Sequence, residues 1–181
     1  MYLIIDTETA GLPRNYRAPI EDLDNWPRMV QAAWARYDGR GNHLQTQSHI
    51  IRPDGFSISR DAQRIHGISP QRARREGIPL QDVLSQLSAA VRGCRAIVAH
   101  NIAFDEPVIA AEYLRLDMKF PFGRKKRICT MKETTAFCGI PGRRGFKWPR
   151  LDELYRILFK EDFTDAHDAR VDVEACARCF F

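Results

Sequence analysis

Two acidic residues near the N-terminus carry the first chemical signal in the sequence. The apolar run at residues 3–5 is followed by Asp6 and Glu8. Side chains alternate along a strand, so both carboxylates would face the same side and repel one another. Alone, such a pair is common as solvated turn residues at a strand end. It becomes a candidate site when other functional groups join it.

A third carboxylate, Asp172, lies on the apolar stripe of a helix predicted over residues 168–180. Helical spacing places it among Ala169, Val173, Cys176, Cys179 and Phe180. A buried carboxylate needs a partner. That partner is either an arginine or backbone cap, or a cation shared with Asp6 and Glu8 that relieves their repulsion. Oxygen ligands favour magnesium or manganese over zinc.

His167 precedes Asp172 by five residues. Five residues rotate a regular helix by about 140°, so the two share a face only if His167 lies before the helix begins. Asp168 is the predicted N-cap, which would leave His167 free to reach the site. There it could accept a proton near neutral pH. The alternative is an ordinary surface histidine at a helix terminus.

Asp105 is the fourth candidate carboxylate. A short strand at residues 96–99 ends before His100 and Asn101, and Asp105 is expected in or before the first turn of the next helix, where Pro107 is tolerated. A helix cap is the ordinary role for such an aspartate. Ligands, however, bind at strand ends in layered α/β domains, which favours a shared site.

The remaining sequence predicts the elements that would position these groups. Expected strands are 1–6, 29–37, 43–51, 96–99 and one near 128–130. Expected helices are 59–66, 80–91, one ending near 116, and three near 131–138, 149–159 and 168–180. This order predicts an α/β domain with a mixed sheet and helices on its faces. Residues 14–27 form a long connection, either a functional loop or a solvated insertion.

Composition limits the class of protein. The chain has 181 residues, of which 44% are hydrophobic and 28% charged, which predicts a single globular domain over residues 1–181. No apolar run reaches the roughly 18–20 residues that cross a bilayer, so we expect a cytoplasmic protein with no membrane partner. Five cysteines are expected to be reduced, with Cys176 and Cys179 sharing a buried helix face. The net charge of +5 favours polyanionic partners.

Basic residues gather at 124–127 and at 143–150. The second cluster mixes aromatic residues with cations, which suits the phosphates and bases of a single strand, and Lys147 and Trp148 are its best candidates. For the first cluster, a solvated surface is the simpler interpretation.

Three segments together resemble the exonuclease motifs of the DEDDh family, whose members include the proofreading epsilon subunit of bacterial DNA polymerase, ribonuclease T and the animal 3′-repair exonucleases. The segments are residues 6–9 (DTET), 100–105 (HNIAFD) and 167–172 (HDARVD). Residues 64–69 (RIHGIS) also resemble the family segment beside the nucleotide pocket. The likeness covers nearly the whole chain.

The resemblance implies a ribonuclease H-like five-stranded mixed sheet flanked by helices, and removal of nucleotides from the 3′ end of single-stranded nucleic acid, with DNA favoured. Two Mg²⁺ or Mn²⁺ ions would be held by Asp6, Glu8, Asp105 and Asp172, with Asp6 bridging them, and His167 would be the general base. DNA replication or repair proteins would be possible partners.

The same resemblance implies a substrate pocket. Its residues would be Thr7, Ala10, Leu12, Ile65, His66 and Asn101, with Leu12 a wedge between the last two bases. Ordinary core positions are the alternative for Leu12 and Ile65. The chain departs from many relatives at Ala10, where they have threonine, and at Gln31, where several have glutamate. It also has a long connection between the first expected strand and the second.

Two other functions remain open at this stage. One is an RNA-trimming 3′ exoribonuclease, because these motifs do not distinguish the sugars. The other is a non-catalytic module that binds nucleic acid.

Overall fold

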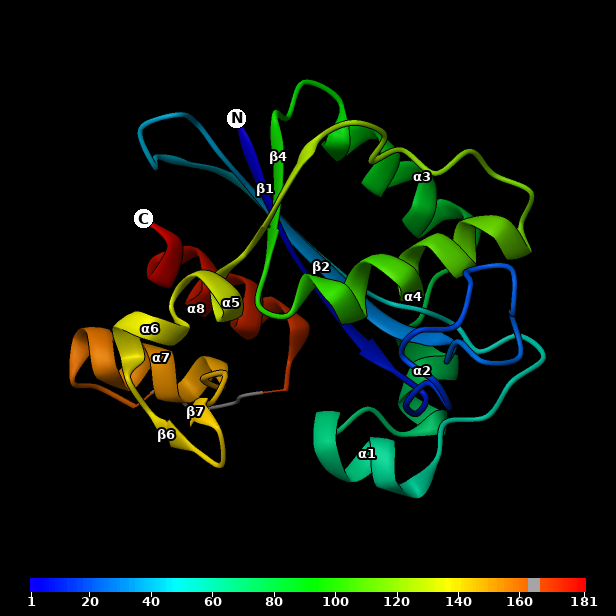
Figure 1. The fold of residues 1–181 in the computed structure, drawn as a ribbon. Helices are drawn as coiled ribbons and strands as arrows, with labels where there is room; N and C mark the ends of the chain where they lie inside the picture. The colour runs from blue at the N-terminus through cyan, green and yellow to red at the C-terminus, as the bar shows by residue number, and fades with distance from the viewer. Residues whose placement is uncertain (163–166) are drawn as a thin grey trace.

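The structure is a computed structural model that describes residues 1–162 and 167–181 (Figure 1). Its strands are β1 (Tyr2–Thr9), β2 (Met29–Tyr37), β3 (His43–Ile50), β4 (Ala96–Ala99), β5 (Lys126–Cys129), β6 (Pro141–Gly142) and β7 (Gly145–Phe146). Its helices are α1 (Arg60–His66), α2 (Pro70–Glu76), α3 (Leu80–Val91), α4 (Ile102–Arg115), α5 (Thr130–Glu133), α6 (Thr135–Cys138), α7 (Leu151–Phe159) and α8 (Ala169–Phe180).

Five strands form one mixed sheet in the order β3-β2-β1-β4-β5. β1 pairs antiparallel with β2, which pairs antiparallel with β3, whereas β4 runs parallel to β1 and β5 runs parallel to β4. This confirms the predicted α/β fold. The carboxyl ends of β1 and β4 therefore meet at one edge of the sheet, which is where α/β folds bind ligands.

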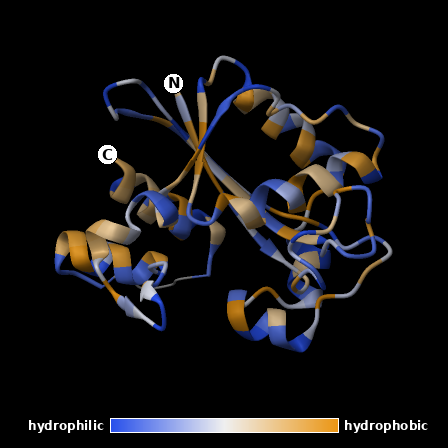
Figure 2. Cartoon of the chain, viewed as in Figure 1, coloured by the Kyte–Doolittle hydropathy of each residue, from blue (hydrophilic) through white to orange (hydrophobic). Residues whose placement is uncertain are grey.

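Alternation along β1 divides its residues between two cores. Leu3 and Ile5 face α3 and α4 and belong to the larger hydrophobic cluster. Ile4 faces the other side and packs with Val173 of α8. Figure 2 shows hydrophobic residues concentrated where β1, β2 and β4 cross. Alternate residues farther along β1 therefore face either α8 or the layer of α3 and α4.

Several predicted boundaries were wrong. β1 does not end at Asp6 but continues to Thr9, because β2 keeps pairing with it as far as Met29. The single helix predicted at 131–138 is divided at Thr134 into α5 and α6. Pro107 lies inside α4 rather than in its first turn, so the carbonyl of Ala103 loses its helical donor. Ala103 is exposed, and water can serve that carbonyl.

Other elements were missed or shifted. The helix α2 begins after Ser69, whose side chain caps it by accepting from the Arg72 N–H. The short hairpin of β6 and β7 was read only as a basic stretch. β5 starts at Lys126, not near 128, and α7 starts two residues after Pro149.

The connection at residues 14–27 is anchored at Asn25 and Trp26, which are buried, although residues 14–17 are exposed. Asn25 accepts from the Asn15 N–H at 2.7 Å and donates to the Asn15 carbonyl at 3.0 Å. Trp26 is buried in the larger core, and Arg115 of α4 donates to the Trp26 carbonyl. No helix among residues 1–162 and 167–181 combines the length and apolar character needed to cross a membrane.

Candidate active site

The first strand presents its carboxylates to α8. Asp6 and Glu8 follow Ile4 at two-residue intervals and so share its face of the sheet. In register, Glu8 lies opposite Gln31 of β2. Asp6 and Glu8 both line a cleft of about 800 Å³ at this end of the sheet.

Thr7 points to the opposite face and connects β1 with α4. Its backbone N–H and its hydroxyl both donate to Oδ1 of Asp105, at 3.0 and 2.8 Å. Asp105 is buried and lies in the first turn of α4, as expected. The sharp turn before the helix is made by Asn101 in a left-handed conformation (φ 74°), which asparagine tolerates better than most residues. Asp105 is thereby brought to the same cleft.

Asp172 and His167 come from the start of α8. Asp168 caps the helix by accepting from the Arg170 N–H at 2.9 Å, as the sequence predicted. His167 lies just before the helix; its side chain is exposed and its backbone is in the left-handed conformation (φ 73°). The backbone N–H of His167 donates to Oδ2 of Asp172 at 3.0 Å. Ligand atoms of Glu8, His167 and Asp172 all lie within 4.8 Å of one another. Asp6 and Asp105 line the same cleft outside this closest group.

Gln31 holds the start of α8 in place. Its buried side chain accepts from the Ala169 N–H at 3.2 Å and donates to Ser48 at 3.1 Å and to Asp168 at 3.4 Å. The amide of Gln31 therefore accepts one hydrogen bond and donates others, and it adds no negative charge beside Glu8. Sequence reasoning recorded Gln31 only as a departure, although a polar residue inside a buried strand was a signal for such a role.

The pKa of each of the four acids is raised above its ordinary value. Burial, followed by the charges of Asp105, Asp172 and Glu8, raises the pKa of Asp6 well above its ordinary range. Burial and the charge of Asp172 raise the pKa of Glu8 to about 8. Burial raises the pKa of Asp105 to about 7, although the two hydrogen bonds from Thr7 lower it. Burial raises the pKa of Asp172 to about 6, although the hydrogen bond from the backbone of His167 lowers it.

Among the described residues, no lysine or arginine forms an ion pair with any of these four carboxylates. The arginine partner considered for Asp172 is therefore absent from that part of the chain. Four acidic groups crowded at one cleft, with the imidazole of His167 close to two of them, are a donor set that fits hard divalent cations. Bound cations would offset the repulsion and the burial that raise the pKa values.

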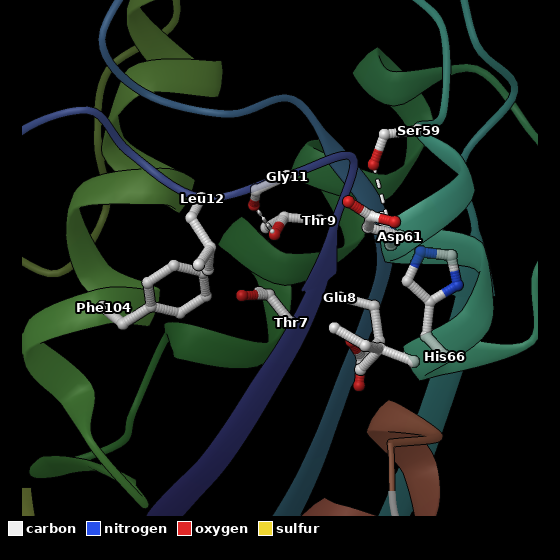
Figure 3. Close-up of a pocket in the computed structure, with 11 residues that line it drawn as sticks. Thr7, Glu8, Thr9, Gly11, Leu12, Ser59, Asp61, His66 and Phe104 are labelled. Carbon is white, nitrogen blue, oxygen red and sulfur yellow. Dashed lines mark hydrogen bonds between the residues drawn. The ribbon is translucent and has the colours of Figure 1, made fainter.

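A smaller cavity of about 380 Å³ adjoins Glu8 (Figure 3). Figure 3 shows Leu12 and Phe104 on one side, His66 on the other, and Thr7 and Glu8 between them on β1. Leu12 is 72% exposed and Ile65, which also lines the cavity, is 56% exposed. These exposures rule out the core alternative for both residues. His66 is buried, its Nδ1 accepts from the Ile68 N–H, and burial lowers its pKa.

Two predicted binding residues do not line either cavity. Ala10 packs against the small core of α1 and α2, and its N–H donates to the Arg28 carbonyl. Lys147 donates to Glu153 at 2.6 Å. Asn101, by contrast, does line the larger cleft.

Two aromatic residues in the larger cleft, Tyr16 and Phe104, were given no binding role from sequence, whereas Trp148, which was predicted to contact nucleic acid, does line this cleft. Phe104 belongs to the second motif, so its position was an available signal. Tyr16 gave none, because its loop has no periodic pattern. Its ring centroid lies 6.5 Å from that of Phe104.

The cysteines take no part in the site. All five are free, as expected. Burial raises the pKa of Cys176, and it raises that of Cys179 to about 12, so both thiols stay protonated at neutral pH.

The mixed sheet and its covering helices define a ribonuclease H-like fold. A family model described as "Exonuclease", of the ribonuclease T type, matches residues 3–180. The chain belongs to this exonuclease family, which confirms the resemblance to the DEDDh enzymes.

Individual relatives match over part of their length. Ribonuclease T of Blochmanniella pennsylvanica is 32% identical over 130 residues, covering 66% of this chain and 58% of the relative. Ribonuclease T of Actinobacillus pleuropneumoniae is 29% identical over 128 residues, covering 65% and 55%. The chain thus spans little more than half the length of the curated relatives it matches.

Solved structures support the fold. E. coli exonuclease I in complex with a dA16 oligonucleotide superposes with a TM-score of 0.78 at 22% identity, over 98% of this chain and 39% of that one. The zinc-bound form of E. coli exonuclease I with single-stranded DNA gives a TM-score of 0.75 at 24% identity, over 98% and 38%.

Proposed function

We propose that this protein is a metal-dependent 3′-to-5′ exonuclease that hydrolyses single-stranded nucleic acid and releases nucleoside 5′-monophosphates. One observation carries the proposal: Asp6, Glu8, Asp105, Asp172 and His167, from three separate segments, line a single cleft. Membership of the exonuclease family supports the same activity.

Each acidic residue has a part in this proposal. Asp6, Glu8, Asp105 and Asp172 hold two divalent cations, Mg²⁺ or Mn²⁺. When bound, such ions supply the positive charge that activates water and stabilises the attacked phosphate. Thr7 keeps Asp105 in position through its two hydrogen bonds.

His167 is the proposed general base. It accepts a proton from the attacking water, whose oxygen forms a new bond to the terminal phosphorus. The bond from that phosphorus to the 3′ oxygen of the penultimate nucleotide breaks, and this oxygen leaves. The proximity of His167 to Glu8 and Asp172 supports this role.

The smaller cavity is the proposed site of the terminal nucleotide. Leu12, Phe104 and Ile65 offer apolar contact to a base without reading its edges, which suits an enzyme that removes any nucleotide. The exposed Leu12 is placed to separate the last two bases.

DNA is the favoured substrate, and RNA is the second candidate. The structural relatives in complex with oligonucleotides hold single-stranded DNA. The curated relatives are named ribonuclease T, which favours RNA.

The test is a time course with 5′-labelled single-stranded DNA and RNA of one sequence, in Mg²⁺, Mn²⁺ or EDTA. We expect a ladder that shortens from the 3′ end, requires metal, and is absent with Asp172→Asn. Intact substrate in every condition, with binding still detectable, would favour the non-catalytic nucleic-acid-binding module instead.

A further inference from the structure

The hairpin of β6 and β7 and the residues around it form an exposed basic and aromatic surface. Arg143 and Arg144 lie at its tip, Phe146 is 59% exposed on β7, and Trp148 is 61% exposed just beyond it. Lys132 of α5 lies with Nζ 5.9 Å from the Trp148 ring centroid. We call these five residues the hairpin track. In the view of Figure 1, the hairpin lies at the lower left and α1 at the lower right.

The cations of the hairpin track are available for a ligand. Within the described parts of the chain, Lys132, Arg143 and Arg144 form no ion pair with a carboxylate. Two neighbouring cations differ, because Lys147 pairs with Glu153 and Arg150 pairs with Asp152. The positive charge that remains uncompensated therefore lies along the hairpin and not at its base.

The hairpin track is continuous with the catalytic cleft. Trp148 lines that cleft, as do Pro149 and Arg150. The base of the hairpin is tied to the floor of the site, because His100 Nε2 lies 3.0 Å from the Pro149 carbonyl and must donate to it. Its Nδ1 then accepts from Thr130 at 2.9 Å. A chain leaving the cleft beside Trp148 would meet the free cations directly.

We propose that the hairpin track binds the part of a single strand that lies upstream of the terminal nucleotides. Lys132, Arg143 and Arg144 contact successive phosphates, and Trp148 stacks on an unpaired base. A single strand fits better than a duplex, because an exposed ring face recognises only an unstacked base. Without bound metal, the four carboxylates of the cleft repel phosphates, so in EDTA the affinity for a long strand comes from cations outside the cleft. This inference rests on the proposed function for the orientation of the strand.

The experiment compares the double variant R143Q/R144Q with R124Q/K126Q. Both remove two exposed positive charges, but Arg124 and Lys126 line neither described cavity. Binding of 5′-fluorescein-labelled dT20 is measured by fluorescence anisotropy in EDTA, over a series of KCl concentrations. Hydrolysis of the dinucleotide dT2 in Mg²⁺ is measured separately.

We expect R143Q/R144Q to weaken dT20 binding by about tenfold and to lower the slope of log K against log salt by about 1.4, since each single-strand phosphate contact contributes about 0.7. The control variant should bind like the wild type, and all three proteins should hydrolyse dT2 equally. If dT20 binding weakened equally in both variants, or did not weaken in R143Q/R144Q, the proposal that the hairpin track binds the strand would be wrong. Wild-type protein that binds dT20 through these arginines but leaves dT2 intact would refute the proposed exonuclease and retain the track.

Discussion

The crowded carboxylates predict an unusual pH dependence for the metal-free protein. A carboxyl whose pKa is raised by folding binds its proton more tightly in the folded state than in the unfolded state. Stability is then greatest at low pH and is lost as the pH rises from the unfolded pKa towards the folded pKa. For Glu8 that window runs from 4.5 to about 8, and for Asp105 from 3.8 to about 7.

The magnitude can be estimated between pH 6.5 and 8. One pKa unit corresponds to about 1.4 kcal/mol, so Glu8 lowers the free energy of unfolding by roughly 2 kcal/mol over this interval and Asp105 by roughly 1 kcal/mol. For a chain of this size, that total lowers the melting temperature by roughly 5–10 °C. Burial lowers the pKa of His49, His66 and His100, and these groups oppose the change over this interval, but each by less than one carboxyl because an unfolded histidine is already half deprotonated at pH 6.5.

The assay is thermal unfolding in EDTA at pH 6.5 and pH 8, followed by circular dichroism. Glu8→Gln should melt higher than the wild type at pH 8 and show a smaller difference between the two pH values. Glu76→Gln is the control, because Arg72 and Arg75 lower the pKa of that exposed carboxyl. A wild-type melting temperature that stays constant or rises with pH would refute the electrostatic reasoning.

Three further predictions concern single residues. Asp172→Ala should abolish metal-dependent hydrolysis while circular dichroism shows a folded protein; full activity would contradict its role as a ligand. His167→Ala should lower kcat by roughly 10²–10⁴-fold and leave Mg²⁺ affinity, measured by calorimetry, nearly unchanged; unchanged kcat would exclude a general base. Glu112→Ala should lower the free energy of unfolding by roughly 3–5 kcal/mol in urea titrations, because Glu112 is fully buried and pairs with Arg28 and Arg115; a loss below 1 kcal/mol would show that the buried pairing is dispensable.

Elements with a strong local pattern were predictable from the sequence. β2 and β4 match their expected bounds because each is a continuous, mostly apolar run that is buried on both faces, and α3 matches because it buries one apolar face of helical spacing. Asp168 was recognisable as an N-cap because the apolar stripe of α8 begins just after it. Strand alternation, the apolar stripe of α8 and the strand end before Asp105 already favoured a shared site for the four carboxylates, and the family motifs supplied the role of each.

Features set by tertiary contacts were not predictable. Tyr16 enters the cleft because the loop around it is folded by the Asn15–Asn25 hydrogen bonds and by Arg115, none of which leaves a local pattern. The sequence predicts Lys147 as a cation that contacts nucleic acid, yet Glu153, six residues later, forms an ion pair with it. The sequence shows which charged residues are present, but the ion pairs formed in the folded chain determine which of them can bind a ligand.

The alternation of β1 explains why one strand can assemble the whole site. Asp6 and Glu8 face α8 and meet Asp172, whereas Thr7, between them, faces α4 and holds Asp105 by two hydrogen bonds. Thr7→Val keeps the shape of the side chain and removes only the hydroxyl donor. Because hydrogen bonding from Thr7 lowers the pKa of Asp105, this variant should raise that pKa further and weaken Mg²⁺ binding at pH 7 more than at pH 8.5. Equal weakening at both pH values, measured by calorimetry, would mean that Thr7 positions Asp105 without tuning its charge.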